Sequence, residues 1–173
     1  DIIVSIDEVA FHQIILNLIS NSLHILPPGK SIKIDVEGID EYYVKVVYRN
    51  DGEPITEEQM DAYLDESFAT YNGVAELIEW CFRNEILIMI NTTGMIGYFQ
   101  RIFAKNLLPR IPVLSAHPMV RFPAKETDPQ QIFDLHETGD KGENTEAVIR
   151  SFNIPPNKII IIGDSGGYNP HFQ

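Results

Sequence analysis

The segment 158–167 reads Lys158-Ile159-Ile160-Ile161-Ile162-Gly163-Asp164-Ser165-Gly166-Gly167, an apolar run that leads directly into a glycine-rich acidic turn. A short continuous apolar run of this kind is typical of a strand buried on both faces of a parallel sheet. Ligands of such sheets collect at the carboxyl ends of the strands, which is where Asp164 would lie. A carboxylate in that place suits a hard cation such as Mg²⁺, because Mg²⁺ prefers oxygen ligands.

Apolar runs and helical periodicities alternate through the rest of the C-terminal two-thirds of the chain. Further strands are predicted at 86–90 and 113–116, and helices at about 57–68, 73–84, 96–105 and 144–152. The stretch between the predicted strand at 113–116 and Lys141 is polar and irregular. Strands that alternate with helices predict an α/β fold, with a parallel sheet flanked by helices in a Rossmann-type arrangement.

Residues 1–56 have a different pattern. The stretch 9–26 carries apolar residues at helical spacing and ends at a Pro-Pro-Gly turn, and strand-like stretches follow at 31–36 and 42–48. This segment therefore predicts a helix plus a β-hairpin. The composition changes near residues 50–56, which predicts two domains, 1–56 and 57–173.

The chain carries 25 acidic against 13 basic residues, for a formal net charge of −12. Such a surface repels nucleic acids and anionic lipids, so we expect neither nucleic acid nor membrane as a partner. No segment of the sequence predicts a membrane span or a signal peptide. The single cysteine, Cys81, lies in an apolar stretch and has no internal disulfide partner, which favours a reducing, cytoplasmic location.

Two further polar groups accompany Asp164. Thr92 follows the predicted strand 86–90, where a hydroxyl can bind a phosphoryl oxygen, and Lys141 precedes a predicted helix. A strand-end hydroxyl, a lysine and a strand-end aspartate are three of the parts that a phosphoryl-transfer site needs. The pattern therefore predicts a phosphoryl-transfer site, with Mg²⁺ as the cofactor.

The same parts in the same order resemble three motifs of haloacid dehalogenase-like phosphatases. This resemblance covers residues 57–173 and implies a Mg-dependent phosphohydrolase that acts on a small phosphorylated metabolite. It implies that Thr92 binds the transferring phosphoryl group, that Lys141 neutralises it, and that Asp164 holds Mg²⁺. Tyr168 stands where the family usually has a second metal-binding acid, and we expect the core to be truncated at its C-terminus.

The nucleophile of that family is the first aspartate of an Asp-x-Asp pair, and it forms an aspartyl-phosphate. This sequence has no clean copy of the pair. Asp35, with Glu37 as the second acid, is the first candidate, because a carboxylate is the required attacking group. Ser5 is the second candidate. The resemblance therefore leaves open whether the domain is active.

Three amide side chains recur every four residues in the first predicted helix, at Gln13, Asn17 and Asn21, and so line one helix face. Together with the Pro-Gly turn, the two strands and the segment Asn50-Asp51-Gly52, they resemble the ATP-binding domain of sensor histidine kinases. The resemblance implies that Asn17 and Asn21 contact the metal ion and the phosphates of ATP.

The same resemblance assigns the turn after the second strand to the adenine base. It implies that Asp51, beside Gly52, accepts a hydrogen bond from the adenine amino group. The usual second glycine is replaced, since the next two residues are Glu53 and Pro54, and no glycine-rich lid follows at 71–74.

The sequence leaves three functions open. The first is the phosphohydrolase, and the alternative is an ATP-binding module of the histidine kinase type. The third is a catalytically silent α/β scaffold, chimeric or engineered, in which Asp164 caps a turn and Asn17 and Asn21 are only exposed polar positions. The substrate and the oligomeric state do not follow from the sequence.

Overall fold

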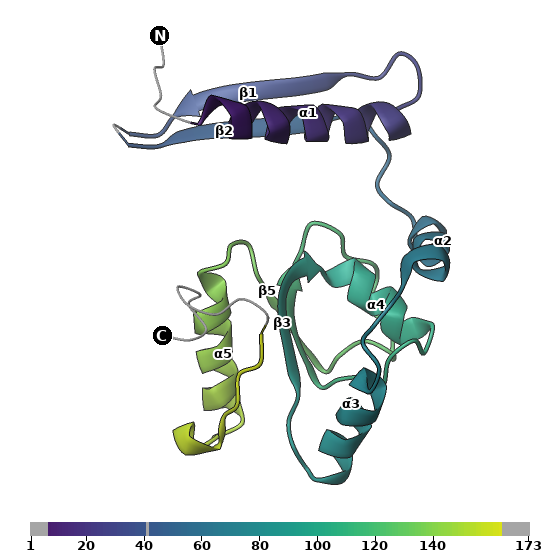
Figure 1. The fold of residues 1–173 in the computed structure, drawn as a ribbon, viewed down its shortest axis with the longest axis vertical. Helices are drawn as coiled ribbons and strands as arrows, with labels where there is room; N and C mark the ends of the chain where they lie inside the picture. The colour runs from purple at the N-terminus through teal and green to yellow at the C-terminus, as the bar shows by residue number, and fades with distance from the viewer. Residues whose placement is uncertain (1–6, 41, 164–173) are drawn as a thin grey trace. The chain divides into compact units, whose positions relative to one another are not determined.

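A computed structural model describes residues 7–40 and 42–163 of the chain (Figure 1). The chain divides into two compact units, Asp1–Pro54 and Ile55–Gln173. We describe each unit by itself. No helix in the described part of the chain is both long and apolar enough to cross a membrane.

The first unit contains one helix and one antiparallel hairpin. They are α1 (Glu8–Ile25), β1 (Ile32–Gly38) and β2 (Val44–Asn50). The Asp7 side chain accepts a hydrogen bond from the Ala10 amide at 3.0 Å and so caps the first turn of α1. Gly29 adopts a φ of 88° in the turn that follows the helix, a conformation that glycine tolerates best. The predicted helix and hairpin are confirmed.

The two faces of the hairpin differ in polarity. Ile34 pairs with Tyr48 across the strands, and this face packs on α1, since the Tyr48 hydroxyl lies 3.0 Å from the Leu18 carbonyl oxygen. The opposite face is charged, and there Asp35 forms an ion pair with Arg49. Alternation of this kind favours one register, because a slip of one residue would turn the charged residues of a strand toward α1. The apolar face is only partly covered, since Ile34 and Val36 remain 41 % and 53 % exposed.

The second unit is an α/β domain with a three-stranded parallel sheet. Its elements are α2 (Glu57–Ser67), α3 (Val74–Arg83), β3 (Met89–Met95), α4 (Ile96–Ala104), β4 (Val113–His117), β5 (Gln131–Asp134), α5 (Asp140–Ser151) and the 3₁₀ helix η1 (Pro156–Lys158). The strand order is β3-β4-β5, with both pairs parallel. The predicted parallel sheet flanked by helices is therefore confirmed at this level, and nothing in the strand order identifies a Rossmann-type or haloacid dehalogenase-like version.

The predicted strand at 158–162 is wrong in the described structure. Lys158 ends the 3₁₀ helix, and Ile159–Ile162 is extended chain that pairs with no described strand. Ile160 is 86 % exposed, so it is not a core residue. An apolar run forms a strand only where a neighbouring strand supplies main-chain hydrogen bonds. In the described sheet the last strand on this side is β3, and the run does not pair with it.

The core of the second unit lies around β4, where Val113, Leu114, Ser115 and Ala116 are all buried. Leu114 packs against α4, whereas the Ser115 hydroxyl accepts a hydrogen bond from Asn144 of α5 at 2.9 Å. Successive residues of a strand point to opposite faces, so α4 and α5 cover opposite faces of the sheet, as Figure 1 shows.

The first turn of α4 approaches the chain after β4 closely. The Gly97 amide donates to the Val120 carbonyl oxygen at 2.7 Å. A Cβ atom at Gly97 would come within 3.0 Å of that oxygen and within 2.7 Å of the Val120 side chain. A glycine is therefore required where this helix starts.

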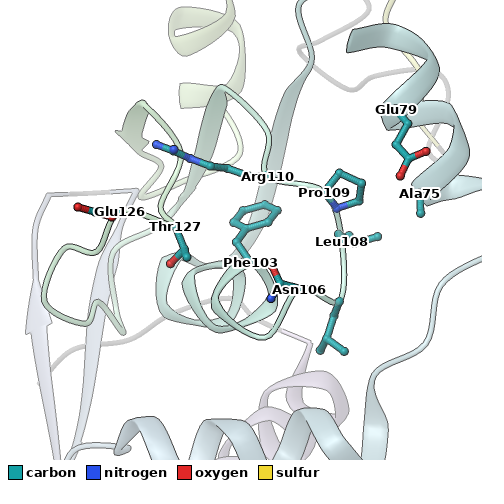
Figure 2. A pocket seen from close by; sticks show the side chains of 10 residues that line it. Ala75, Glu79, Phe103, Asn106, Leu108, Pro109, Arg110, Glu126 and Thr127 are labelled. Atoms are coloured by element: carbon teal, nitrogen blue, oxygen red, sulfur yellow. The ribbon is translucent and has the colours of Figure 1, made fainter. Parts of the chain in front are cut away.

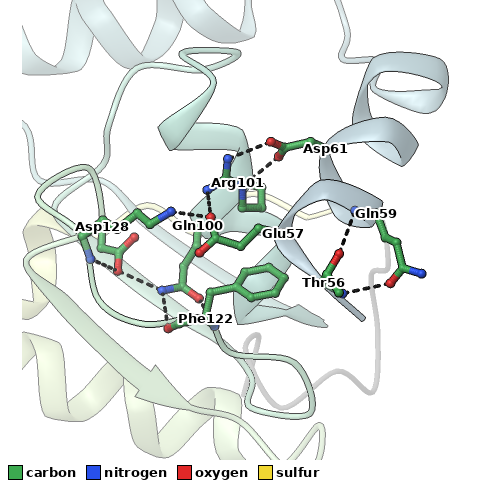
Figure 3. Close-up of polar contacts among 9 residues, drawn as sticks. Thr56, Glu57, Gln59, Asp61, Gln100, Arg101, Phe122 and Asp128 are labelled. Atoms are coloured by element: carbon green, nitrogen blue, oxygen red, sulfur yellow. Dashed lines mark hydrogen bonds and ion pairs between the residues drawn. The ribbon is translucent and has the colours of Figure 1, made fainter. Parts of the chain in front are cut away.

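Arg101 of α4 makes the most buried polar contact with α2, and Lys105 at the end of α4 adds an ion pair with Asp65. Arg101 donates to Asp61 through Nε at 2.7 Å and Nη2 at 2.8 Å, and to Glu57 through Nη1 at 2.5 Å (Figure 3). Its side chain is only 12 % exposed. The start of α2 is fixed by a capping box, in which Thr56 and Gln59 each accept the other's backbone N–H.

A second polar contact fixes the loop between β4 and β5. Gln100 of α4 accepts a hydrogen bond from the Phe122 amide at 2.8 Å and donates to the Asp128 carboxylate at 2.8 Å (Figure 3). Both side chains are buried. These contacts satisfy the Gln100 amide and the Asp128 Oδ2, which also accepts the Lys125 amide, whereas the buried Asp128 Oδ1 has no partner among the described residues.

We expect Arg101→Met to destabilise the protein by about 2 kcal/mol, because it leaves the partly buried Asp61 carboxylate without its bidentate donor, whereas Glu57 keeps its ion pair with Lys125. Urea unfolding, followed by circular dichroism, measures this. Arg150→Met is the matched control, since Arg150 forms an exposed ion pair with Glu146 that is worth less than about 0.5 kcal/mol. Equal losses in the two variants would contradict the anchoring role of Arg101.

The contribution of this contact to stability depends on pH. Hydrogen bonding to Arg101 lowers the pKa of Asp61 from its usual value of 3.8. A carboxylate with a lowered pKa stabilises the fold above its unfolded pKa, and the stability is lost as the pH falls through the folded pKa. We expect the stability difference between wild type and Arg101→Met to be full at about pH 6 and to shrink below about pH 4. A difference that grew with acidification would contradict this.

Candidate functional site

The exposed side of α1 carries two of the predicted amides. Gln13 donates through Nε2 to the Asn17 Oδ1 at 2.8 Å, and both side chains are exposed. The other side of the helix faces the hairpin and holds Ser22, which is buried. Asn21 belongs to the same helix, one turn after Asn17, but its side chain is outside what the structure describes.

A cluster that the sequence did not predict joins α1 to β2. The Ser22 hydroxyl lies 2.8 Å from the Tyr48 hydroxyl and accepts a hydrogen bond from the Asn50 Nδ2 at 3.1 Å. Tyr48 and Asn50 are two residues apart in one strand and therefore share its helix-facing side. That spacing, together with a serine on the apolar side of the helix, is the signal by which sequence reasoning could have found the cluster.

Asp51 and Gly52, predicted to bind the base, both have structural partners at the end of β2. The Asp51 Oδ2 accepts hydrogen bonds from the Ser31 hydroxyl at 2.5 Å and from the Ser31 amide at 3.2 Å. These bonds from Ser31 lower the pKa of the Asp51 carboxyl, and the Lys30 charge adds to the effect. The carboxylate is therefore ionised at neutral pH and available only as an acceptor.

Gly52 holds the Asn50 side chain in place. The Gly52 amide donates to the Asn50 Oδ1 at 2.9 Å. A Cβ atom at Gly52 would come within 2.8 Å of the same oxygen, so any larger residue would displace it. The glycine thus fixes the direction of the Asn50 amide toward Ser22.

The residues predicted to form the phosphohydrolase site are not assembled in the described structure. Asp35 belongs to the first unit, where Arg49 and Lys33 pair with its carboxylate. Asp164, the predicted metal ligand, and Ser5, the alternative nucleophile, lie outside the described residues. Among the residues described, no group of three or more His, Cys, Asp or Glu is placed to hold a metal ion.

Thr92 and Lys141 do come together, in one groove of about 720 Å³ beside β3. Residues 85–92, helix α5 and the segment 159–163 line this space, which we call the β3 groove. The Thr92 Oγ1 accepts a hydrogen bond from the Gly94 amide at 3.1 Å, at an irregularity in the pairing of β3 with β4. Asn91 ties β3 to α5, because its Nδ2 donates to the Lys141 carbonyl oxygen at 2.9 Å.

Figure 2 shows a second hollow, of about 620 Å³, between α3 and the loops around residues 106–110 and 126–127. Phe103 and Leu108 form its apolar part, and Arg110 and Glu126 line it with charged groups. None of the residues predicted to carry chemistry lies in it.

Comparison with known proteins supports one of the two resemblances. Residues 6–84 match the family model described as histidine kinase-, DNA gyrase B- and HSP90-like ATPase. No curated protein and no solved structure matches the chain. The matched residues include Asn17, Asn21, Asp51 and Gly52, and they end before Thr92 and Lys141. The prediction of a haloacid dehalogenase-like phosphohydrolase is therefore wrong, and the ATP-binding alternative fits better.

The matched region does not coincide with one structural unit. It extends past Pro54 into α2 and α3, whose residues Met60, Leu64 and Ile78 belong to the core of the second unit. Residues 6–84 therefore contain all the described residues of the first unit and the first two helices of the second.

We expect Ser22→Ala to weaken the attachment of α1 to β2, because Tyr48 and Asn50 lose a shared partner in a partly buried place, at a cost of about 1–2 kcal/mol. Faster amide hydrogen exchange in β2 would report the change. Ser20→Ala is the control, since Ser20 is exposed on the same helix and makes no described side-chain hydrogen bond. The same exchange rates in both variants would show that the cluster does not hold the helix.

Proposed function

We propose that residues 6–84 act as a nucleotide-binding module that takes ATP together with Mg²⁺. The observation that carries the proposal is the match of this region to an ATPase family model. The partner is then a small phosphorylated molecule rather than a nucleic acid or a membrane, in keeping with the net charge of −12.

The amides of α1 suit a metal-phosphate group. The Asn17 side chain offers an oxygen to a hard cation and an NH₂ group to a phosphate oxygen. Its oxygen accepts from Gln13 in the free helix, so binding of the ion exchanges one exposed hydrogen bond for a metal ligand. Because the described residues hold no acidic metal cluster, Mg²⁺ would arrive with the nucleotide, whose phosphate oxygens and bound waters supply most of its ligands.

The end of β2 suits the base. Asp51 uses one carboxylate oxygen for Ser31, and an ionised carboxylate has about four acceptor positions, so capacity for an amino group is left. The Ser31 contacts fix the carboxylate in place before any ligand binds, which reduces the entropy cost of binding. Gly52 gives a ligand close access to the backbone at this turn.

Titration calorimetry with Mg·ATP on the whole chain tests the proposal. We expect saturable binding to wild type and at least about a tenfold loss of affinity in Asn17→Ala, because the amide contacts the metal-phosphate group. His12→Ala, an exposed change on the same helix, should bind like wild type. An absence of saturable heat in wild type, or equal affinities in the two variants, would overturn the proposal.

The prediction that Mg²⁺ binds together with ATP can be measured by amide hydrogen exchange. A ligand at about 100 times its Kd stabilises the folded protein by about 2.7 kcal/mol, which slows exchange. We expect Mg·ATP to slow amide hydrogen exchange in α1 and Mg²⁺ alone to leave it unchanged, because the described residues offer Mg²⁺ no acidic site of their own. Protection of α1 by Mg²⁺ without nucleotide would contradict this.

A further inference from the structure

The β3 groove has a free strand edge as one wall. The sheet order places β3 at an end, with β4 as its only neighbour among the described strands. One side of its main chain therefore presents N–H and C=O groups that no described strand pairs. Met89 and Asn91 of this strand line the groove directly.

The opposite wall is the extended run Ile159–Ile162. It rises from the 3₁₀ helix beside β3 and α5, as Figure 1 shows, and lines the same groove as β3. Ile160 and Ile162 are 86 % and 83 % exposed, although a run of four isoleucines has high strand propensity. Two extended backbones thus border one space, and neither is paired across it in the described structure.

Helix α5 forms the rest of the lining. It contributes Val148, which is buried, and Ile149. The Asn91 Oδ1 is also buried, and it has no hydrogen-bond partner among the described residues. This acceptor lies on a residue that lines the groove, so a donor on an occupant of the groove could satisfy it.

Two lysines line the groove. Lys158 directly precedes the run of isoleucines, and Lys141, the second residue of α5, accepts a hydrogen bond from Asn91 through its carbonyl oxygen. Neither lysine forms an ion pair with a described residue, and Glu85 is the acidic residue in the lining. Acidic groups on an occupant would therefore be favoured.

We propose that the β3 groove binds an extended apolar peptide segment of another protein, which adds to β3 as a further strand. The free edge selects a strand, because a helix or a compact small molecule cannot pair with a row of main-chain groups. The volume of about 720 Å³ is within the range of sites that bury ligands of modest size. The occupant has β-branched residues, acidic residues for the lysines, and a backbone N–H for Asn91.

A fluorescently labelled synthetic peptide tests the proposal on the whole chain. The probe has a glutamate at each end and alternating valine and threonine between them, with seven residues to match the length of β3. We expect saturable binding by fluorescence anisotropy and slower amide exchange in β3. A second peptide, with methyl groups on its three central backbone nitrogens, should bind at least about tenfold more weakly, because it cannot pair with the strand edge.

Two protein variants complete the test. Ile160→Asp places a charge on the exposed wall of the groove without disturbing the core, and it should weaken binding at least about tenfold. Ile39→Asp makes the same change at another exposed isoleucine, in the first unit, and should bind like wild type. The proposal is overturned by no saturation up to about 1 mM peptide, by equal binding of the methylated peptide, or by equal binding of the two variants.

Discussion

Main-chain pairing between strands is the constraint on which the structure of the second unit depends. β4 has a neighbour on each side and helices on both faces, and its residues are accordingly buried. Among the described strands β3 has a neighbour on one side only, and residues of β3 line a groove. β3, with the sequence Met-Ile-Asn-Thr-Thr-Gly-Met, is less apolar than the run Ile159–Ile162, yet β3 forms a strand and the run pairs with no described strand. The difference therefore comes from the neighbours available to each.

The first unit meets the same constraint with fewer elements. One helix covers the apolar face of a two-stranded hairpin, and a hairpin alone is marginally stable in water. Ser22, Tyr48 and Asn50 add a polar attachment at one end of that contact. The attachment leaves Gln13 and Asn17 on the opposite side of α1, so the residues that hold the unit together are separate from those proposed to bind a nucleotide.

Local signals in the sequence predicted most elements because each depends on near neighbours. The cap at Asp7, the capping box at Thr56 and the charged and apolar alternation of the hairpin are short-range features. β5 was missed because four residues, Gln131–Asp134, are too few to show a period within a polar loop. The run Ile159–Ile162 was overpredicted because pairing is a long-range property that no local pattern contains.

The predictions of site residues also depend on how far they rest on local patterns. Thr92 and Lys141 were predicted to approach one another, and both line the β3 groove, since parallel strands and the helix that covers them bring distant residues to one edge. The chemistry inferred from that proximity did not follow, because both residues have local structural roles, and Thr92 lies within β3 rather than after the strand. Thr92 accepts the Gly94 amide, and the Lys141 carbonyl oxygen accepts Asn91. Thr92 and Lys141 thus led to the correct groove. The proposed occupant follows instead from the unpaired edge of β3, and residue types alone do not show whether a strand edge is paired.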